Sequence, residues 1–232
     1  MQFGVDEAGK GPALGSMFAA AVSLKDPNHL PDGIADSKRL APARREELAA
    51  TLRADDRIRV GVAEITPATI DDPETNMNAL AVSAHATAIA DALGELDDRE
   101  PDDAAAPTDP IEGLCDACDT DADRFARRVA EACSAEIDRP LEIDARHGAD
   151  DDSAVVGAAS VIAKVERDAH VAAIAEEYGE VGSGYPSDPT TREFLESYVD
   201  DRGELPPFAR ASWSTCEDVL AAAQQTGLDR FG

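Results

Sequence analysis

The chain has 232 residues, a length that fits one large α/β domain with a small appendage. Hydrophobic residues make up 43% of it, which excludes a disordered chain, and no run of about eighteen apolar residues occurs, which excludes a membrane-spanning helix. The N-terminus lacks a charged segment followed by an apolar one, so we expect no secretory signal and a cytoplasmic location.

The charge balance is extreme. The chain has 21 basic and 48 acidic residues, a net charge of −27, and its only lysines are Lys10, Lys25, Lys38 and Lys164. An acidic, lysine-poor but globular composition is typical of salt-adapted cytoplasmic proteins. In molar salt the Debye length is only about 3 Å, so the net charge does not exclude a nucleic-acid partner. Local contacts and metal ions must then decide what the chain binds.

The sequence predicts three strands and two helices in its first hundred residues. Residues 1–7 read as a strand that enters a glycine-rich turn, and residues 13–24 as a buried strand that pairs with it antiparallel. Pro42 opens a helix that runs to about Ala54, because proline suits the first helical turn. Residues 57–65 form a third strand, and residues 77–96 an amphipathic helix.

The middle of the chain contains an expected insertion. Residues 97–110 are rich in Asp, Pro and Ala, which predicts an exposed acidic loop. Residues 111–116 form a short strand, residues 120–136 a helix and residues 140–144 a strand.

Helices dominate the C-terminal part. A long helix is expected from about Ser153 to Glu177, followed by a loop at residues 182–189 and helices at residues 190–200 and 215–224. The core side of the long helix is small and apolar: Val156, Ala159, Ile162 and Ala163. This order of elements predicts an α/β fold around a mixed central β-sheet flanked by helices, with a helical C-terminal extension.

Four acidic residues lie where chemistry is expected. Asp6 and Glu7 end the first strand, Asp116 ends a later strand, and Asp150 precedes the long helix. If these strands are neighbours, the carboxylates converge and suit Mg²⁺ or Mn²⁺, and two such ions about 3.5–4 Å apart suit phosphoryl chemistry. On spacing alone, Asp116 and Asp150 could equally be solvated charges in acid-rich surroundings.

Two other motifs leave alternatives open. The segment from Gly4 to Lys10 matches most of a phosphate-binding loop, although Gly11 stands where Ser or Thr would hold Mg²⁺. Cys115 and Cys118 form one C-x-x-C without a second zinc-binding pair. We expect thiols there, with a redox or metal pair as the alternative.

Several motifs, taken together, resemble the ribonuclease HII (type 2 ribonuclease H) family, in particular its archaeal branch. They are Asp6–Pro12, Asp36–Leu40, Asn76–Leu80, Asp116–Thr120, Asp123–Phe125, Ala149–Asp150, Ala158–Asp168, Gly182–Pro189 and Arg210–Trp213. They follow one another in the family's order and cover nearly the whole chain, so chance is an implausible explanation.

The resemblance implies an RNase H-like fold and a two-metal site in which Asp6, Glu7, Asp116 and Asp150 are both the catalytic residues and the metal ligands. It implies an endonuclease that cuts RNA in RNA/DNA hybrids, and at ribonucleotides embedded in DNA, leaving 5′-phosphate and 3′-hydroxyl ends. Such an enzyme serves RNA primer removal and ribonucleotide excision. A different nuclease or a strand-transfer enzyme of the same fold is the alternative.

The resemblance also implies how the substrate is recognised. The turn Gly9-Lys10-Gly11 and Tyr185 match the family's sensors of the ribose 2′-hydroxyl, the group that separates RNA from DNA. Lys10 replaces the usual arginine, which loses a bidentate contact. We expect Lys38 to contact phosphate as well. Lys164 could do the same, or could pair with Glu166 or an active-site carboxylate.

The C-terminus resembles a peptide that binds the replication sliding clamp, with Gln225, Leu228 and Phe231 as anchors. We therefore divide the chain into a catalytic domain at residues 1–200, a packed helical segment at 201–224 and a flexible tail at 225–232, and we expect a monomer.

Overall fold

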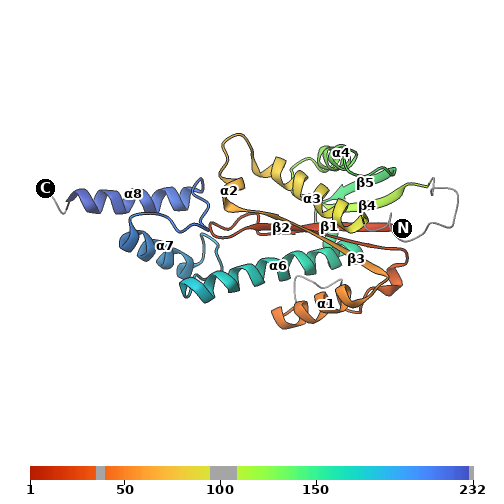
Figure 1. Ribbon diagram of the computed structural model, residues 1–232, viewed down its shortest axis with the longest axis horizontal. Coiled ribbons are helices and arrows are strands. Elements are labelled where there is room, and N and C mark those ends of the chain that lie inside the picture. Colours follow the sequence, from red (N-terminus) through yellow and green to blue (C-terminus); the bar gives the residue numbers. More distant parts are fainter. Residues whose placement is uncertain (35–39, 95–108, 230–232) are drawn as a thin grey trace. The chain divides into compact units, whose positions relative to one another are not determined.

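The computed structural model describes residues 1–34, 40–94 and 109–229, with the side chains of residues 226–229 outside that description. Figure 1 shows the elements along the chain. Their bounds are β1 Gln2–Ala8, β2 Met17–Leu24, η1 Pro27–His29, α1 Pro42–Ala54, β3 Ile58–Ile65, α2 Pro67–Ile70, α3 Met77–Gly94, β4 Ile111–Asp116, α4 Ala122–Cys133, β5 Leu141–Arg146, α5 Ala149–Asp152, α6 Ala154–Tyr178, α7 Pro189–Arg202 and α8 Ser214–Asp229.

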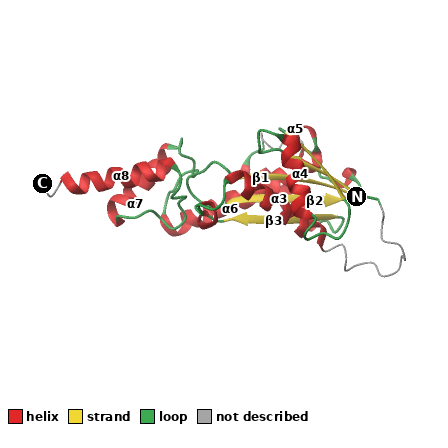
Figure 2. Cartoon of the chain, turned by 90° about the horizontal axis from the view of Figure 1, so that it is seen from above, coloured by secondary structure: helices red, strands yellow, loops and turns green. Residues whose placement is uncertain are grey.

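The strands form one mixed sheet in the order β3-β2-β1-β4-β5. β1 pairs antiparallel with β2 and parallel with β4, and β4 pairs parallel with β5. A short link allows the antiparallel pair, whereas the parallel neighbours are joined through helices. The predicted mixed sheet and the antiparallel pairing of its first two strands are confirmed, and Figure 2 shows β1, β2 and β3 side by side.

Most predicted elements occur, with shifted ends. The predicted strand at residues 13–24 begins only at Met17, because Leu14 instead makes an isolated bridge with Ala209. The helix predicted at 120–136 begins at Ala122, where the Asp121 side chain caps it by accepting from the Arg124 N–H. The short helices α2 and α5 were not predicted, although the N-cap Thr66 and Pro67 in the first turn are a local signal for α2.

The chain divides by its contacts into two compact units. The first comprises Met1–Ala8, Phe18–Glu64 and Met77–Glu166, and the second Gly9–Met17, Ile65–Asn76 and Arg167–Gly232. The boundaries between these units do not include residue 200, where the predicted catalytic domain ends. The predicted organisation into a catalytic domain, a C-terminal segment and a tail stays a prediction.

The first unit is built around the sheet. α1 and the first part of α6 lie on one face, and α3 and α4 on the other (Figure 1). Gly4 lets α6 approach β1 closely, because a Cβ there would lie 2.5 Å from the Val155 carbonyl carbon. The expected core side of α6, Val156, Ala159, Ile162 and Ala163, is fully buried, as predicted.

The second unit has its own apolar core, which includes Leu14, Leu195, Val199 and Cys216. Two segments far apart in sequence meet inside it: the Ala13 N–H donates to the Gly184 carbonyl at 2.8 Å, and the Gly15 N–H to the Phe208 carbonyl at 2.8 Å. The turn that follows β1 is therefore held by the C-terminal part of the chain.

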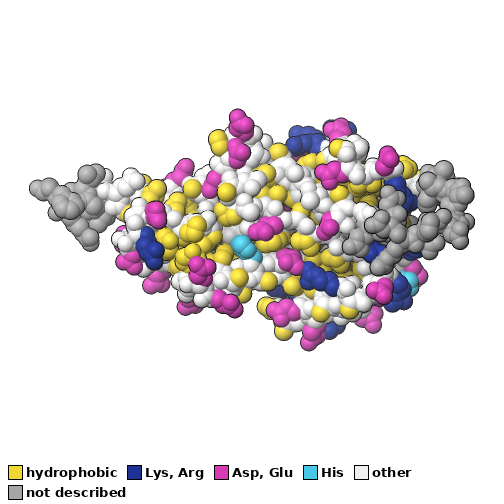
Figure 3. Space-filling model, viewed as in Figure 1, with side chains coloured by type: hydrophobic (Ala, Val, Ile, Leu, Met, Phe, Trp, Pro, Cys, Tyr) yellow, Lys and Arg dark blue, Asp and Glu magenta, His cyan; other side chains and the backbone are white. Residues whose placement is uncertain are grey.

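The sequence predictions that fall outside the description include most of the acidic loop, residues 97–108, and Lys38. No helix in the described ranges is long and apolar enough to cross a membrane. On the face drawn in Figure 3, Asp and Glu side chains are scattered between apolar patches.

Candidate active site

The fold brings together the four predicted carboxylates, all within the first unit. Val5 of β1 lies beside Cys115 of β4 in parallel register, so the next residues, Asp6 and Asp116, end up at neighbouring positions. Asp116 accepts a hydrogen bond at 2.9 Å from the Ala149 N–H, the residue before Asp150. Asp6 and Asp150 are 5% and 2% exposed.

Burial and mutual repulsion raise the pKa values of two of these acids. Burial raises the pKa of Asp6 from 3.8 to about 7, and the charges of Glu7 and Asp116 add to that rise. Burial also raises the pKa of Asp116, and the charges of Asp150 and Glu7 add to it. Asp116 and Asp150 are thus neighbours in one cluster of mutually repelling carboxylates, which argues against the alternative of independent solvated charges.

Lys164 belongs to the same cluster. Its Nζ donates to the Ser160 Oγ at 2.6 Å and lies 4.0 Å from an Asp150 carboxylate oxygen. Ser160 in turn hydrogen-bonds the Asp6 side chain, which lowers the pKa of Asp6 against the larger effect of burial. Of the partners that the sequence left open, the structure favours the active-site carboxylate, because Glu166 pairs with Arg53 instead.

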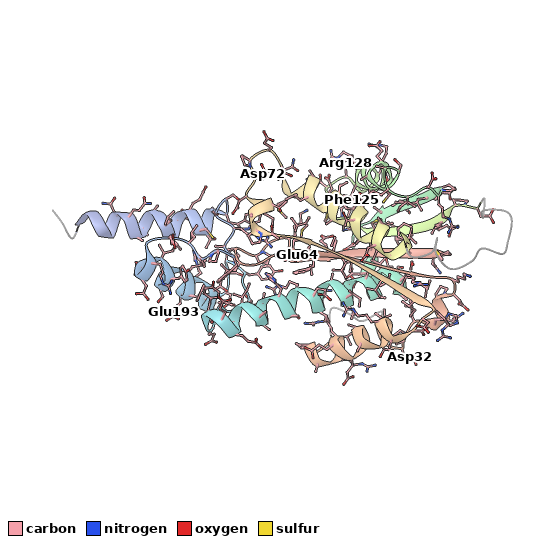
Figure 4. The ribbon with its side chains drawn as sticks, in the orientation of Figure 1. Asp32, Glu64, Asp72, Phe125, Arg128 and Glu193 are labelled. Carbon is pink, nitrogen blue, oxygen red and sulfur yellow. The ribbon has the colours of Figure 1, made fainter. Side chains whose placement is uncertain are left out.

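Sequence reasoning missed His85. It lies on α3, fully buried, with its Nε2 2.9 Å from a Glu7 carboxylate oxygen. Phe125 of α4, labelled in Figure 4, packs edge-to-face on the imidazole with 5.0 Å between ring centroids. A single histidine on an otherwise apolar helix face was the available signal. Its contact with Glu7 holds that carboxylate in place.

The predicted recognition turn lies in the second unit and is built on Arg210. The guanidinium donates to the Gly9 carbonyl at 2.5 Å, to the Lys10 carbonyl at 3.0 Å and to the Gly15 carbonyl at 2.9 Å. The Trp213 indole N–H donates to the Gly11 carbonyl at 3.3 Å. All three carbonyls of the turn are therefore occupied, which fixes its shape.

Arg210 is fully buried, and sequence reasoning missed its role. Desolvation lowers its pKa to about 10, so it stays charged at neutral pH. Trp213 covers the guanidinium at 5.1 Å from its ring centroid. A buried cation beneath the turn adds positive potential where the net charge of the chain is strongly negative.

Tyr185 lies beside the turn, as the motif comparison implies. Its ring is 40% exposed and sits under the Arg167 guanidinium at 5.3 Å. A Cβ on Gly11 would lie 3.6 Å from this ring, so Gly11 and Tyr185 are neighbours. The turn and the aromatic ring thus form one surface of the second unit.

The phosphate-loop alternative is wrong. Gly4 to Ala8 are part of β1, and the next element is β2 rather than the helix whose N-terminus a phosphate-binding loop requires. The four cysteines are thiols, three of them buried and Cys118 half-buried. The Gln225 anchor of the predicted clamp peptide lies in α8, whereas the Leu228 and Phe231 side chains are outside the described residues.

This donor set fits hard divalent cations. Four carboxylates, two of them buried and two half-buried, repel one another, and oxygen ligands of this kind are those that Mg²⁺ and Mn²⁺ prefer. The arrangement therefore calls for positive charge beyond that of Lys164. Bound cations would supply it.

The raised pKa of Asp6 predicts a pH-dependent stability of the metal-free protein. Between about pH 4 and 7 the folded chain keeps a proton that the unfolded chain releases, so stability falls as pH rises through this window. With a chelator present at pH 8, Asp6→Asn should have a higher free energy of unfolding than the wild type, by on the order of 1–4 kcal/mol. At pH 5.5 the difference between the two proteins should be smaller. Exposed Asp144→Asn is the control. A difference in the free energy of unfolding that does not change with pH would contradict the raised pKa of Asp6.

Comparisons with known proteins agree with this geometry. The family profile described as Ribonuclease HII matches residues 3–216. The chain is 55% identical over 231 residues to the Ribonuclease HII of Haloarcula marismortui, covering 100% of both chains.

Solved structures show the same fold. The ribonuclease H2 from Pyrococcus horikoshii OT3 is 32% identical with a TM-score of 0.81, covering 96% of this chain and 98% of that one. The RNase HII of Archaeoglobus fulgidus, solved as a complex with PCNA, is 32% identical with a TM-score of 0.77, covering 94% and 96%. Bst-RNase HIII, solved in complex with Mn²⁺, shares the fold at a TM-score of 0.74 with 18% identity, covering 97% and 70%. The predicted RNase H-like fold is thus confirmed, and the chain belongs to the ribonuclease HII family.

Proposed function

We propose that this ribonuclease HII hydrolyses RNA/DNA hybrids and DNA with embedded ribonucleotides through two Mg²⁺ or Mn²⁺ ions held by Asp6, Glu7, Asp116 and Asp150. The observation that carries the proposal is the cluster of mutually repelling carboxylates, two buried and two half-buried, at the ends of β1 and β4 and in α5. Family membership supports the substrate, and the Mn²⁺ complex of Bst-RNase HIII, a protein of the same fold, is consistent with the cofactor.

In this proposal, residues of the chain hold and orient the carboxylates that bind the metal ions. Bound cations would supply an activated water and neutralise charge on the leaving oxygen. Asp6 is central to the cluster, and Glu7 is oriented by His85. Lys164 and Ser160 keep Asp6 and Asp150 at fixed positions. Cleavage on the 5′ side of a ribonucleotide leaves 5′-phosphate and 3′-hydroxyl ends without a covalent intermediate.

Substrate selection belongs to the turn Gly9-Lys10-Gly11 and Tyr185. Because the carbonyls of the turn are occupied by Arg210 and Trp213, the turn presents a fixed set of groups to the ribose and its phosphate. The exposed face of Tyr185 is available to stack on or contact the sugar. We assign Lys38 and Lys10 to phosphate contacts. The cellular role that we propose is RNA primer removal and ribonucleotide excision in the cytoplasm, carried out by a monomer.

Replacing one carboxylate tests the metal site. Asp116→Asn keeps the oxygen that accepts the Ala149 N–H but loses the negative charge, so the fold should survive while cleavage of a labelled hybrid falls by more than about 100-fold. Asp144→Asn is the matched control, because Asp144 is exposed and also accepts a backbone N–H, from Ala145 at 2.9 Å. Cleavage by Asp116→Asn at the wild-type rate would contradict the proposal.

Lys10 tests recognition of a single ribonucleotide. Lys10→Arg restores a planar donor pair, which should raise cleavage of a duplex with one embedded ribonucleotide relative to a full hybrid by about 10-fold. Rates on both substrates are compared with those of Lys25→Arg, an exposed lysine at the end of β2. An unchanged ratio in Lys10→Arg would show that the side chain of this turn does not sense the junction.

The tail gives a second interaction to test. The PCNA complex of the Archaeoglobus fulgidus relative supports our proposal that residues 225–232 bind the sliding clamp through Gln225, Leu228 and Phe231. A pull-down with the clamp should retain the full chain and lose a chain that ends at Gln224, with Phe231→Ala weakened and Asp229→Ala unaffected. Equal retention of full and shortened chains would exclude this role.

A further inference from the structure

A second kind of metal site shares one residue with the carboxylate cluster. Glu7, His85 and Cys118 each direct a ligand atom to one place, and these atoms all lie within 4.8 Å of one another. They come from β1, α3 and the segment after β4, all in the first unit. We propose that these three residues bind a borderline-soft divalent cation, Zn²⁺ or one of its chemical relatives such as Co²⁺ or Cd²⁺, in competition with the ions of the active site.

The separations of the three ligand atoms can be compared with those of a tetrahedral site. With metal–nitrogen and metal–oxygen bonds of about 2.0–2.2 Å and a metal–sulfur bond of about 2.3 Å, ligand atoms of such a site lie about 3.3–3.7 Å apart. The His85 Nε2 and Glu7 oxygen are 2.9 Å apart, and the other pairs lie within 4.8 Å. Side-chain shifts of about an ångström would therefore bring the three ligand atoms to bonding distance of one cation, and a water molecule would be the fourth ligand.

The chemical identity of the donors selects the ion. Imidazole and thiolate prefer Zn²⁺ and its neighbours, whereas Mg²⁺ and Mn²⁺ prefer the all-oxygen set of Asp6, Glu7, Asp116 and Asp150. All four cysteines lie in the described part of the chain, where Cys118 is half-buried and the other three are buried. The C-x-x-C pattern thus contributes one ligand to this site, while Cys115 stays a buried thiol.

The site should be weaker than a structural zinc site. A zinc-bound histidine normally donates its second ring N–H to an acceptor that strengthens the ligand. Within the described part of the chain, the Nδ1 of His85 has no hydrogen-bond partner. We therefore expect the site to fill only when zinc is abundant, so that it inhibits the enzyme rather than stabilising the fold.

Inhibition follows from the shared ligand. A Glu7 carboxylate that binds the soft cation together with His85 and Cys118 no longer serves as a ligand in the carboxylate cluster. The inhibition of cleavage rests on the function proposed above. Binding of the soft cation does not depend on that function, so the two can be tested separately.

Cobalt reports on the binding directly. Metal-free wild type in molar KCl is titrated with Co²⁺, and it should show a thiolate-to-cobalt charge-transfer band that saturates at one ion per chain. Cys118→Ser should lose the band and bind Co²⁺ at least about 10-fold more weakly, whereas Cys216→Ala, a thiol in the second unit, should keep both. A wild type without the band, or a Cys118→Ser variant that keeps it, overturns the proposal.

Inhibition is measured separately. Cys118→Ser should cleave hybrid with Mn²⁺ at the wild-type rate but need at least about 10-fold more Zn²⁺ for half inhibition, and added Mn²⁺ should relieve inhibition of the wild type. Equal zinc sensitivity of the two proteins would contradict competition at this site. If the wild type cleaves no hybrid, the proposed function fails while the cobalt spectrum still reports the site.

Discussion

The structure depends on the burial of negative charge at the end of β1. Asp6 is almost completely buried beside three other acids, and its pKa is raised to about 7. A carboxylate in such a place destabilises the folded protein unless positive charge or a proton accompanies it. This arrangement therefore lowers the stability of the metal-free protein and at the same time favours the binding of cations.

The neighbouring features serve that cluster. The parallel pairing of β1 with β4 sets Asp116 beside Asp6, and Gly4 allows α6 to approach with Ser160 and Lys164. His85 fixes Glu7 from the opposite side of β1. The recognition turn follows β1 directly in sequence, and Arg210 holds its carbonyls from the C-terminal part of the chain. The N-terminal strand thus supplies two of the acids that we propose as catalytic, while distant segments supply the residues that position them.

Sequence reasoning reached the strands, the main helices and the four acids, because periodicity, proline and isolated acids at strand ends are local signals. The motif order then tied Asp116 and Asp150 to Asp6. The roles of His85 and Arg210 could not be predicted, because both depend on contacts with residues 78 and about 200 positions away. Lys164 was ambiguous for the same reason: Ser160 and Asp150 are near in sequence, but only the fold decides between them and Glu166.

The central claim is that the four carboxylates hold the ions that act on the scissile phosphate. Anomalous diffraction from crystals of the protein with a hybrid and Mn²⁺ tests it most directly. We expect two anomalous peaks about 3.5–4 Å apart, with Asp6 in contact with both. Peaks elsewhere on the acidic surface, with none among Asp6, Glu7, Asp116 and Asp150, would contradict it.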